Sequence, residues 1–293
     1  MDDQQWLAER FEEHRPRLRA VAYRMLGSLS EADDAVQDAW LRVSRADTSE
    51  VENLGAWLTT IVARVSLNLL RSRKTRREAS LDVHVPDPVI DPVDGTDPEH
   101  EALLADSVGL ALLVVLETLS PPERLAFVLH DMFGVPFEQI APIVDRSSDA
   151  ARQLASRARR RVRGAAPVPD ADLGAQWKVV EAFLAAAHEG NFDALLEVLD
   201  PGVVLRADGG GVADLSRLVR GAEAVASSAT TWSRVGLDLR RALVNGTPGF
   251  VSLRDGQPFS VGAVTISGGR IVEMDILADP ERLAKLDLTL LAG

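Results

Sequence analysis

The chain has 293 residues, of which 46% are hydrophobic and 26% are charged, and its formal net charge is −12. This length exceeds one ordinary core and predicts two or three domains. The absence of cysteine excludes disulfides, thiolate metal sites and a cysteine nucleophile. The N-terminus is acidic and polar, and the longest apolar run, Val108–Leu116, is far shorter than a membrane span. We therefore expect a cytoplasmic protein without a membrane partner.

The negative charge is unevenly distributed along the chain. Residues 1–80 hold 13 basic and 13 acidic side chains, and residues 101–166 hold eight of each. Residues 81–100 hold six acids and no Lys or Arg, whereas residues 167–293 hold 11 basic and 17 acidic residues. Charges act over about 8–10 Å in physiological salt. Local cationic clusters in the balanced blocks therefore decide whether the chain can bind nucleic acid.

Helical spacing of apolar residues predicts three helices within residues 5–78. Gly27 ends the first helix, Ser30 is the expected N-cap of the second, and the third extends from about Leu54 to Arg73. The second helix is acidic and amphipathic. Its polar face is either a surface for a partner or an ordinary solvated face. The candidate residues on this face are Asp33, Asp34, Gln37, Asp38, Leu41 and Arg42.

A stripe of basic residues runs along the C-terminal half of the third predicted helix. Arg64, Asn68 and Arg71 recur at spacings of four and three residues and therefore share one face, and Arg73 and Lys74 extend it. Such a stripe beside amphipathic aromatic residues suits a single-stranded nucleic acid backbone. The alternative is an ordinary exposed helix end.

Residues 82–98 contain four prolines and five aspartates, which predicts an extended acidic linker. Helical periodicity returns at Glu101. Ser120, followed by Pro121 and then by Glu123, predicts the start of a helix. Short helices are expected at about 121–132, 136–144 and 147–162. The tight turn between the last two predicts a helix-turn-helix.

The last of these helices carries six arginines and no acid between residues 150 and 163. Leu154, Ala158 and Val162 are expected to pack inward. A helix of this kind fits the major groove, where Arg reads guanine and Gln reads adenine. The alternative is a solvated cationic helix end that complements the helix dipole. The candidate DNA-binding residues are Ser148, Arg152, Gln153, Ser156, Arg157, Arg159 and Arg160.

The region beyond residues 164–169 predicts an α+β domain. Helices at 173–188 and 191–199 precede short β-like runs, and Asn-Gly, Asp-Gly and Gly-Gly pairs at 245, 255 and 268 indicate hairpins of an antiparallel sheet. Arg206 and Asp208 share one strand face, and Asp275 and Arg254 are candidates to join them, either as a pocket lining or as a structural ion pair. No histidine follows residue 200 and no GxxxxGK[ST] pattern exists. We therefore expect no catalytic residues, no metal and no cofactor.

The order of these motifs resembles a known family. The segments 11–28, 32–41 and 57–74 resemble conserved region 2 of extracytoplasmic-function sigma factors, and 120–163 resembles their region 4. The resemblance covers roughly residues 5–165. It implies that the helix around 33–42 binds core RNA polymerase, a partner with β and β′ subunits, at the clamp helices of β′. It also implies that 64–77 holds the melted downstream promoter element and that 147–162 reads the upstream element. Asn68 and Leu154 depart from the residues common at their positions.

Residues 170–293 resemble the SnoaL-like branch of the NTF2-like fold, in which helices surround a curved sheet that forms a cone-shaped pocket. A subgroup of these sigma factors carries such an extension. Asp208–Gly211 matches a glycine motif of the subgroup, Asp279–Leu283 is a looser match to a second motif, and His84 stands nearest to a tryptophan often found in the linker. The implied regulatory loop and pocket residues are Arg206, Asp208, Gly209, Gly210, Gly211 and Asp275. A small-molecule ligand would be the partner of the pocket.

These observations predict a multidomain chain. Region 2 is expected over residues 1–80, an acidic Pro-rich linker over 81–100, a helix-turn-helix region 4 over 101–165 and a SnoaL-like regulatory domain over 170–293. The expected function is promoter recognition and transcription initiation by a monomer that is not an enzyme. One alternative is a helix-turn-helix regulator that binds operator DNA without polymerase. The other is a SnoaL-like isomerase or cyclase fused to a DNA-binding region, which would need an acid or base in the pocket.

Overall fold

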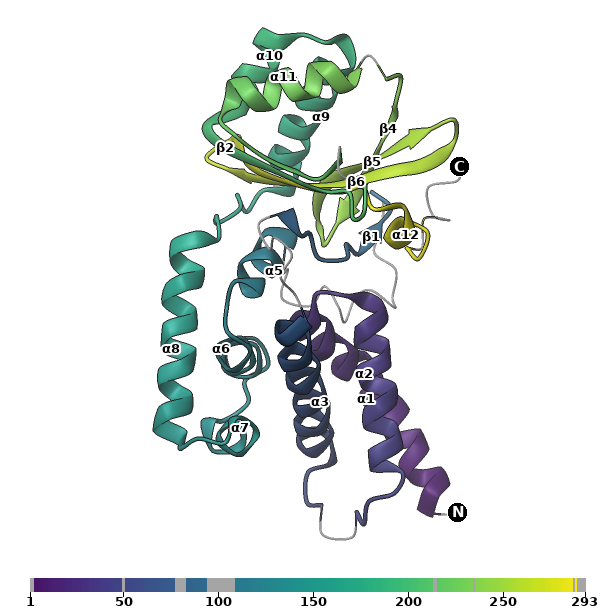
Figure 1. Ribbon diagram of the computed structural model, residues 1–293, viewed down its shortest axis with the longest axis vertical. Coiled ribbons are helices and arrows are strands. Elements are labelled where there is room, and N and C mark those ends of the chain that lie inside the picture. Colours follow the sequence, from purple (N-terminus) through teal and green to yellow (C-terminus); the bar gives the residue numbers. More distant parts are fainter. Residues whose placement is uncertain are drawn as a thin grey trace. The chain divides into compact units, whose positions relative to one another are not determined.

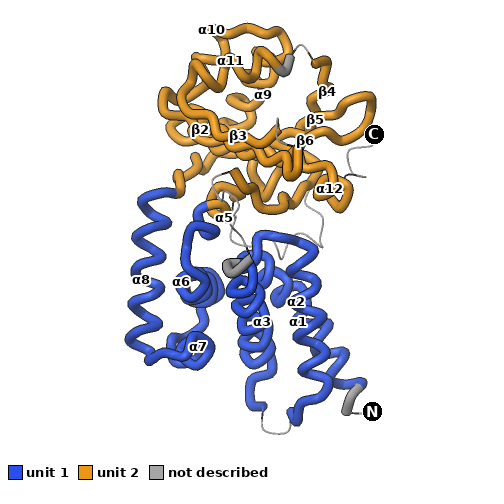
Figure 2. Tube along the Cα trace, viewed as in Figure 1, with its two compact units in different colours: residues 1–79, 101–106, 115–165 blue, residues 80–100, 107–114, 166–293 orange. Residues whose placement is uncertain are grey.

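The computed structural model describes residues 3–48, 51–76, 83–93, 109–212, 215–233, 235–286 and 288. The chain divides into two compact units (Figures 1 and 2). Unit 1 comprises residues 1–79, 101–106 and 115–165, and unit 2 comprises residues 80–100, 107–114 and 166–293. The predicted fold class is confirmed, because helical regions precede an α+β unit. In the described part of the chain, no helix is long and apolar enough to cross a membrane.

Unit 1 is helical. In chain order its elements are α1 (Asp3–Leu26), α2 (Leu29–Val43), α3 (Leu54–Arg76), α6 (Pro121–Phe127), a π-helical turn (Val128–Met132), α7 (Phe137–Val144) and α8 (Ser148–Ala165). Helix α5 (Leu110–Glu117) contributes residues to both units. Helices α1, α2 and α3 pack on one another, and α6, α7 and α8 form a second group that contacts α3. Both predicted groups of helices are therefore present.

Helix caps agree with the sequence in one place and correct it in another. At the start of α6, the Glu123 carboxylate accepts hydrogen bonds from the Ser120 N–H (3.2 Å) and hydroxyl (2.6 Å), as predicted. The N-cap of α2 is Ser28 rather than Ser30. Gly27 has a positive φ of 69° and turns the chain so sharply that the second helix starts at the next possible position. The prediction for Ser30 was therefore wrong by two residues.

A buried arginine joins the two helical groups of unit 1. Arg124 on α6 is 5% exposed, and its Nη1 donates a hydrogen bond to the Met25 carbonyl at 2.8 Å. Burial lowers the pKa of Arg124 to about 10. A buried charge that lost this acceptor would cost several kcal/mol. Arg124 therefore has a structural role and is unavailable to DNA while this contact exists.

Unit 2 is built on a seven-stranded sheet with the order β1-β4-β5-β6-β7-β2-β3. Its strands are β1 (Ile90–Asp91), β2 (Leu199–Asp208), β3 (Arg217–Arg220), β4 (Asp238–Val244), β5 (Thr247–Arg254), β6 (Gln257–Ser267) and β7 (Arg270–Leu277). The three predicted dipeptide turns connect β4 to β5, β5 to β6 and β6 to β7 as hairpins, and both residues of each turn have positive φ. The sheet is not wholly antiparallel as predicted, because β2 pairs parallel with β7.

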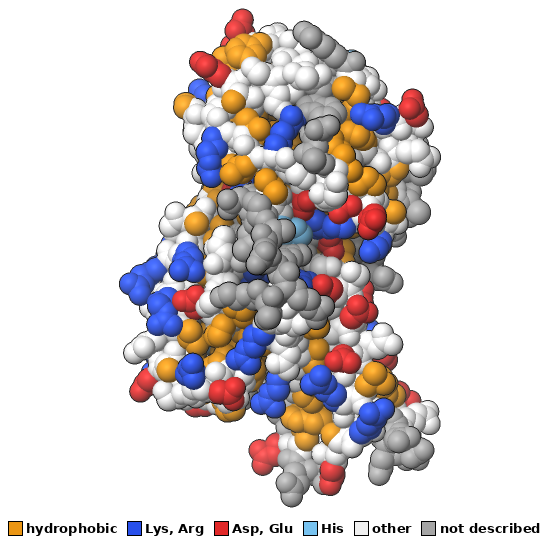
Figure 3. Space-filling view, viewed as in Figure 1, with side chains coloured by type: hydrophobic (Ala, Val, Ile, Leu, Met, Phe, Trp, Pro, Cys, Tyr) orange, Lys and Arg blue, Asp and Glu red, His pale blue; other side chains and the backbone are white. Residues whose placement is uncertain are grey.

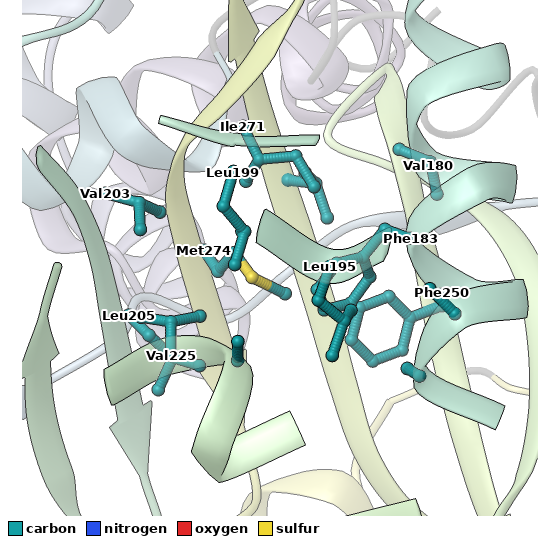
Figure 4. Close-up of a cluster of buried hydrophobic side chains, with 14 of the residues drawn as sticks. Val180, Phe183, Leu195, Leu199, Val203, Leu205, Val225, Phe250, Ile271 and Met274 are labelled. Atoms are coloured by element: carbon teal, nitrogen blue, oxygen red, sulfur yellow. The ribbon is translucent and has the colours of Figure 1, made fainter. Parts of the chain in front are cut away.

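Helices cover one face of this sheet (Figure 1). They are α9 (Leu173–Glu189), α10 (Phe192–Val198) and α11 (Ala222–Ser233), and a short helix, α12 (Pro280–Leu283), follows the last strand. Val180 and Phe183 from α9, Val225 from α11, and Phe250 and Met274 from the sheet belong to one buried cluster (Figure 4). The sequence predicted α9 and α10 but not α11, whose Ala, Ser and Thr residues give a weak apolar pattern.

Candidate functional site

The polar face of α2 is open to solvent, as the helical spacing predicted. Every candidate residue on it is exposed: Asp33, Asp34, Gln37, Asp38, Leu41 and Arg42. Ala32, Ala35, Val36, Ala39 and Val43 are buried on the other side of the helix. Leu41 is 46% exposed among charged neighbours. The face therefore combines exposed charged and polar side chains with the accessible apolar side chain of Leu41.

The basic stripe of α3 is only partly available. Arg64, Asn68 and Arg71 are exposed. Arg73 is half-buried, where it pairs with Glu31 and donates a hydrogen bond to the Leu26 carbonyl at 2.9 Å. These contacts tie the end of α3 to the α1–α2 connection. The side chain of Lys74 lies outside the described residues.

A tight left-handed turn connects α7 to α8. Asp145 ends α7 with a φ of 54°, and the Ser147 hydroxyl accepts a hydrogen bond from the Ala150 N–H at 3.3 Å to cap α8. Asp145 tolerates this conformation because its short polar side chain can adopt positive φ more readily than most residues. The predicted helix-turn-helix is present, with α8 as its second helix.

The inward face of α8 is a seam of alanines. Ala151, Ala155 and Ala158 are buried, whereas Leu154 and Val162 are only half-buried. Of the three residues predicted to pack inward, Ala158 is therefore buried, and Leu154 and Val162 are only partly so. Small side chains permit α8 to approach α6 and α7 closely, and the larger residues are displaced to the sides of the contact.

The polar residues of α8 fall into two groups. Gln153, Ser156 and Arg160 are exposed, and Arg160 has no ion-pair partner among the described residues. Three predicted DNA-binding arginines contact acids of unit 1. Arg152 pairs with Asp149 at 2.6 Å, Arg157 with Glu123 at 3.1 Å and Arg159 with Asp131 at 2.5 Å. Ser148 is half-buried at the start of the helix.

The pairing of these arginines still leaves a cationic surface. Figure 3 shows Lys and Arg side chains gathered over α8, at the left edge of that view. Arg152 and its partner Asp149 are both exposed, so their ion pair is solvent-screened. Pairs of this kind contribute about 0–1 kcal/mol. A phosphate can therefore replace the acid at little cost.

Unit 2 holds a buried acid that contacts the segment 83–93. The Asp208 carboxylate accepts hydrogen bonds from the Val85 N–H (3.0 Å) and the Gly210 N–H (3.0 Å), and it lies 3.0 Å from His84 Nδ1. Burial alone would raise the pKa of Asp208, but these donors lower it to about 2. Asp208 is therefore an anion that fixes residues 84 and 85 on the sheet.

Two residues that the sequence analysis did not select complete this contact. Arg282 donates to the Val85 carbonyl (2.6 Å), to Asp87 (2.5 Å) and to Asp208 (2.9 Å). Asn245 exchanges two hydrogen bonds with Val89, one from its own N–H (2.8 Å) and one to its Oδ1 (3.1 Å). We refer to Asp208, Asn245 and Arg282 as the clamp. Arg282 lies in the 279–283 motif, which was the available signal for it.

The clamp holds the segment as an added strand. Ile90 pairs with Val244 and Asp91 pairs with Leu243 in antiparallel register, so β1 covers the edge of β4. Residues 85–91 are all buried. The acidic segment expected to be an extended linker is therefore extended but part of the sheet in this structure.

The glycine motif next to Asp208 permits close packing. An added Cβ on Gly209 would lie 2.3 Å from Leu215 Cβ, and one on Gly210 would lie 2.2 Å from Asp279 Oδ2. Gly210 also has a positive φ of 58°. Asp279 in turn caps α12 by accepting from the Glu281 N–H at 2.9 Å. Gly211 has open space around it. The motif thus brings α12 and Arg282 against Asp208.

Arg206 and Asp275 form a separate buried ion cluster. Arg206 pairs with Asp275 and, at 2.9 Å, with Glu273. Burial, and then the charge of Glu273, raise the pKa of Asp275 to about 7 against the effect of Arg206. A cavity of about 420 Å³ lies on the other face of the sheet, where it is lined by Leu205, Ala207, Met274 and Ile276. Of the two alternatives for Arg206 and Asp275, the structure contains the structural ion pair, because alternation along β2 and β7 turns these side chains away from the cavity.

Comparison with known proteins identifies both helical groups. A family model of Sigma-70 region 2 matches residues 10–76, and a model of Sigma-70 region 4 matches residues 109–162. ECF RNA polymerase sigma factor SigJ of Mycobacterium tuberculosis is 38% identical over 287 residues, which cover 93% of this chain and 91% of SigJ. The probable ECF sigma factor SigI of the same species is 34% identical over 281 residues, 96% of either chain.

A solved structure extends the similarity to both units. The crystal structure of the Mycobacterium tuberculosis extracytoplasmic function sigma factor SigJ matches with a TM-score of 0.76 at 33% identity and covers 96% of this chain and 99% of that one. Sigma factors are not enzymes, so the isomerase or cyclase alternative is set aside. The chain belongs to the extracytoplasmic-function sigma factors, which bind core RNA polymerase and promoter DNA and initiate transcription at the promoters they recognise.

Proposed function

We propose that unit 2 regulates this sigma factor by holding the chain that connects region 2 to region 4. The observation that carries the proposal is the clamp on residues 83–93, which lie between the two matched regions. A linker sets the effective concentration of the second DNA-binding module once the first is bound. Capture of its middle shortens the span open to each module, and release restores it. The protein would act in the cytoplasm, where promoters and polymerase are found.

We further propose a role for each exposed face of unit 1. The α2 face, with Leu41 at its centre, binds the β′ subunit of core polymerase. The stripe of Arg64, Asn68 and Arg71 holds the melted downstream element, because exposed cations at helical spacing follow a nucleic acid backbone. Arg73 positions this stripe through Glu31 rather than contacting DNA itself.

On α8, Gln153, Ser156 and Arg160 are proposed to contact base edges of the upstream element. Their support is exposure on one side of a helix whose other side is the alanine seam. Arg152, Arg157 and Arg159 are proposed to contact phosphates, since each guanidinium group stays at least partly open to solvent beside its acid. The cavity of unit 2 is proposed to bind a small molecule.

The regulatory proposal is tested by promoter-directed transcription with purified core polymerase. Arg282→Gln removes the contacts to Val85, Asp87 and Asp208, whereas Arg240→Gln removes an exposed pair with Asp238 in the same unit. We expect Arg282→Gln to change initiation at least threefold and Arg240→Gln to leave it unchanged. A rise would mean that the clamp restrains the sigma regions, and a fall would mean that it aligns them. Equal activity of all three proteins would refute regulation through the clamp.

A further inference from the structure

The cavity of unit 2 has the size and lining of a small-molecule site. Its volume of about 420 Å³ lies within the range of roughly 300–1,000 Å³ that is usual for such sites. Helix α9 contributes Phe183 and the sheet contributes Leu205, Phe250 and Met274, four of the apolar side chains of the cluster in Figure 4. The walls therefore favour an apolar body.

Gly262 on β6 allows an aromatic ring to form part of one wall. It pairs with Phe250 on β5, and an added Cβ on Gly262 would lie 2.4 Å from Cζ of the Phe250 ring. The end of the ring therefore occupies the space that a side chain at position 262 would fill. Since Phe250 also lines the cavity, this close packing presents an aromatic surface to whatever the cavity holds.

The charged side chains of the lining already have partners within the protein. In the described part of the lining, the charged side chains other than histidine are Arg217 and Asp238. Arg217 interacts with another group of the chain, and Asp238 pairs with Arg240 at 3.2 Å. His188 is exposed on α9. An ionic ligand would therefore leave water without gaining a free counter-charge, which is costly, so the lining favours a neutral molecule.

The serine hydroxyls of the lining differ in whether they have a partner. Ser252 and Ser260 lie on paired strands, and their hydroxyls hydrogen bond to one another at 2.5 Å. The Oγ atom of Ser228, on α11, is buried and has no hydrogen-bond partner among the described residues. Ser228 follows Val225 of the buried cluster by three residues, so the two share the side of α11 that packs toward the sheet.

The position of Ser228 in a helix makes its lack of a partner unusual. A serine within a helix commonly hydrogen bonds either to a carbonyl of the preceding turn or to water. Thr231 on the same helix does so, because its hydroxyl donates to the Ser227 carbonyl at 2.8 Å. A buried hydroxyl without a partner is unfavourable. A polar atom of a ligand in the cavity would supply the missing partner.

We propose that this cavity binds a neutral, largely apolar molecule with one hydroxyl or carbonyl group, which hydrogen bonds to Ser228 while the aromatic or aliphatic body lies between α9 and the sheet. The inference rests on the proposed small-molecule site of unit 2 and specifies the chemistry of its ligand. A serine hydroxyl can donate to a carbonyl, and it can donate to or accept from a hydroxyl.

The test is equilibrium binding to the full chain without polymerase or DNA, measured by calorimetry. Three probes share a naphthalene body: 2-naphthol has a neutral hydroxyl, naphthalene has no polar group and 2-naphthoate has a charged one. We expect 2-naphthol to bind at least fivefold more tightly than naphthalene, because it gains a hydrogen bond, and at least tenfold more tightly than 2-naphthoate. Transcription is not measured, so failure here would leave regulation through the clamp to its own test.

Two variants locate the polar contact and the cavity. Ser228→Ala removes the hydroxyl, so it should abolish the preference for 2-naphthol and leave the affinity for naphthalene unchanged. Ser227→Ala, at the exposed neighbour on α11, is the matched control and should keep the preference. Ala229 lines the cavity from α11, and Ala229→Phe should weaken 2-naphthol and naphthalene at least tenfold by occupying the space.

Circular dichroism checks that each variant is folded, and binding of naphthalene to Ser228→Ala checks that the cavity itself is intact. Binding of naphthalene or 2-naphthoate to the unmodified chain as tightly as 2-naphthol would overturn the proposal. So would the absence of 2-naphthol binding at millimolar concentration, undiminished binding to Ala229→Phe, or equal loss of the preference in Ser228→Ala and Ser227→Ala.

Discussion

Helix α8 and the clamp both assemble charges, but they do so in opposite surroundings. On α8, Arg152 meets Asp149 with both side chains exposed, so water and salt compete with the pair. In the clamp, the Asp208 carboxylate is buried and accepts from donors on three separate parts of the chain, namely Val85, Gly210 and Arg282. Exposed pairs contribute little and exchange readily, whereas breaking a buried one costs several kcal/mol.

The contrast separates two uses of the same chemistry. The exposed ion pair of α8 orients an arginine side chain that can exchange its carboxylate partner for a DNA phosphate. The clamp fixes one segment of its own chain in one register. Substitutions at each of these sites test that contrast.

Replacing the central acid of the clamp should have the largest effect. Asp208→Ala leaves Arg282 with fewer anionic partners and removes the acceptor of the Val85 N–H, which should weaken docking of residues 83–93 by about 3 kcal/mol. Hydrogen exchange at Val85 and Val89 should accelerate about 100-fold. Asp200→Ala, at an acid near the other end of β2, is the control and should leave both rates unchanged. Protection that survives in Asp208→Ala would assign docking to β1 pairing alone.

The next effect concerns the apolar centre of the α2 face. Leu41→Asp should weaken core polymerase binding by about 2 kcal/mol, roughly 30-fold, because a charge would be buried at the centre of the contact. Stability should change by less than about 0.5 kcal/mol, since Leu41 is 46% exposed. Val168→Asp, at a residue that is 79% exposed and outside α2, is the matched control. Affinity measurements on both variants decide whether this face is the interface.

A smaller effect is expected on α8. Arg160→Gln should weaken promoter binding by the holoenzyme by about 1–2 kcal/mol and relax specificity at one base pair. Arg161→Gln removes a side chain that bridges to Glu123 and to the Thr118 carbonyl, so it should weaken binding to all sequences equally. Binding to matched and mutated promoters at several salt concentrations distinguishes the two. If both variants lose affinity uniformly, Arg160 contacts phosphate rather than a base.

The smallest effect is a pH dependence of unit 2. Burial raises the pKa of Asp275 from its model-compound value of 3.8 to about 7, so the folded state holds this proton more tightly than the unfolded state. The associated stability is complete below about pH 4 and is lost as the pH rises toward 7. Between pH 5 and pH 8 the free energy of unfolding should fall by about 1 kcal/mol or more from this group. Asp275→Asn should flatten that decline in urea unfolding curves, and an unchanged slope would assign it to another residue.

Local features of the molecule were accessible from the sequence. The Ser120–Glu123 cap, the turn at Asp145 and the three dipeptide hairpins each depend on residues within a few positions of one another. The exposed and buried faces of α2 and α3 follow from helical periodicity for the same reason. The alanine seam of α8 was harder, because alanine carries a weak apolar signal.

Long-range pairings were not accessible from the sequence. Arg282 and Asp87 are 195 positions apart, and no local sequence pattern in either segment indicates that the two residues pair. The parallel pairing of β2 with β7 and the β1–β4 pairing likewise depend on register between distant segments. Alternation placed Arg206 and Asp208 on one face correctly, but it could not say which face the cavity occupies. That choice depends on which side α9 and α11 cover.

The position of the clamp in the chain has a consequence for synthesis on the ribosome. Every side chain of the clamp comes after residue 207, whereas the segment it holds ends at residue 93. Translation in cells proceeds at about 5–20 residues per second, so roughly 6–23 seconds pass between the emergence of the end of α8 and that of Arg282. During this interval both promoter-binding regions exist without the sheet that captures their connection. In a newly made chain, residues 83–93 are therefore not yet held by the clamp. Binding to polymerase can occur before the C-terminal unit has folded.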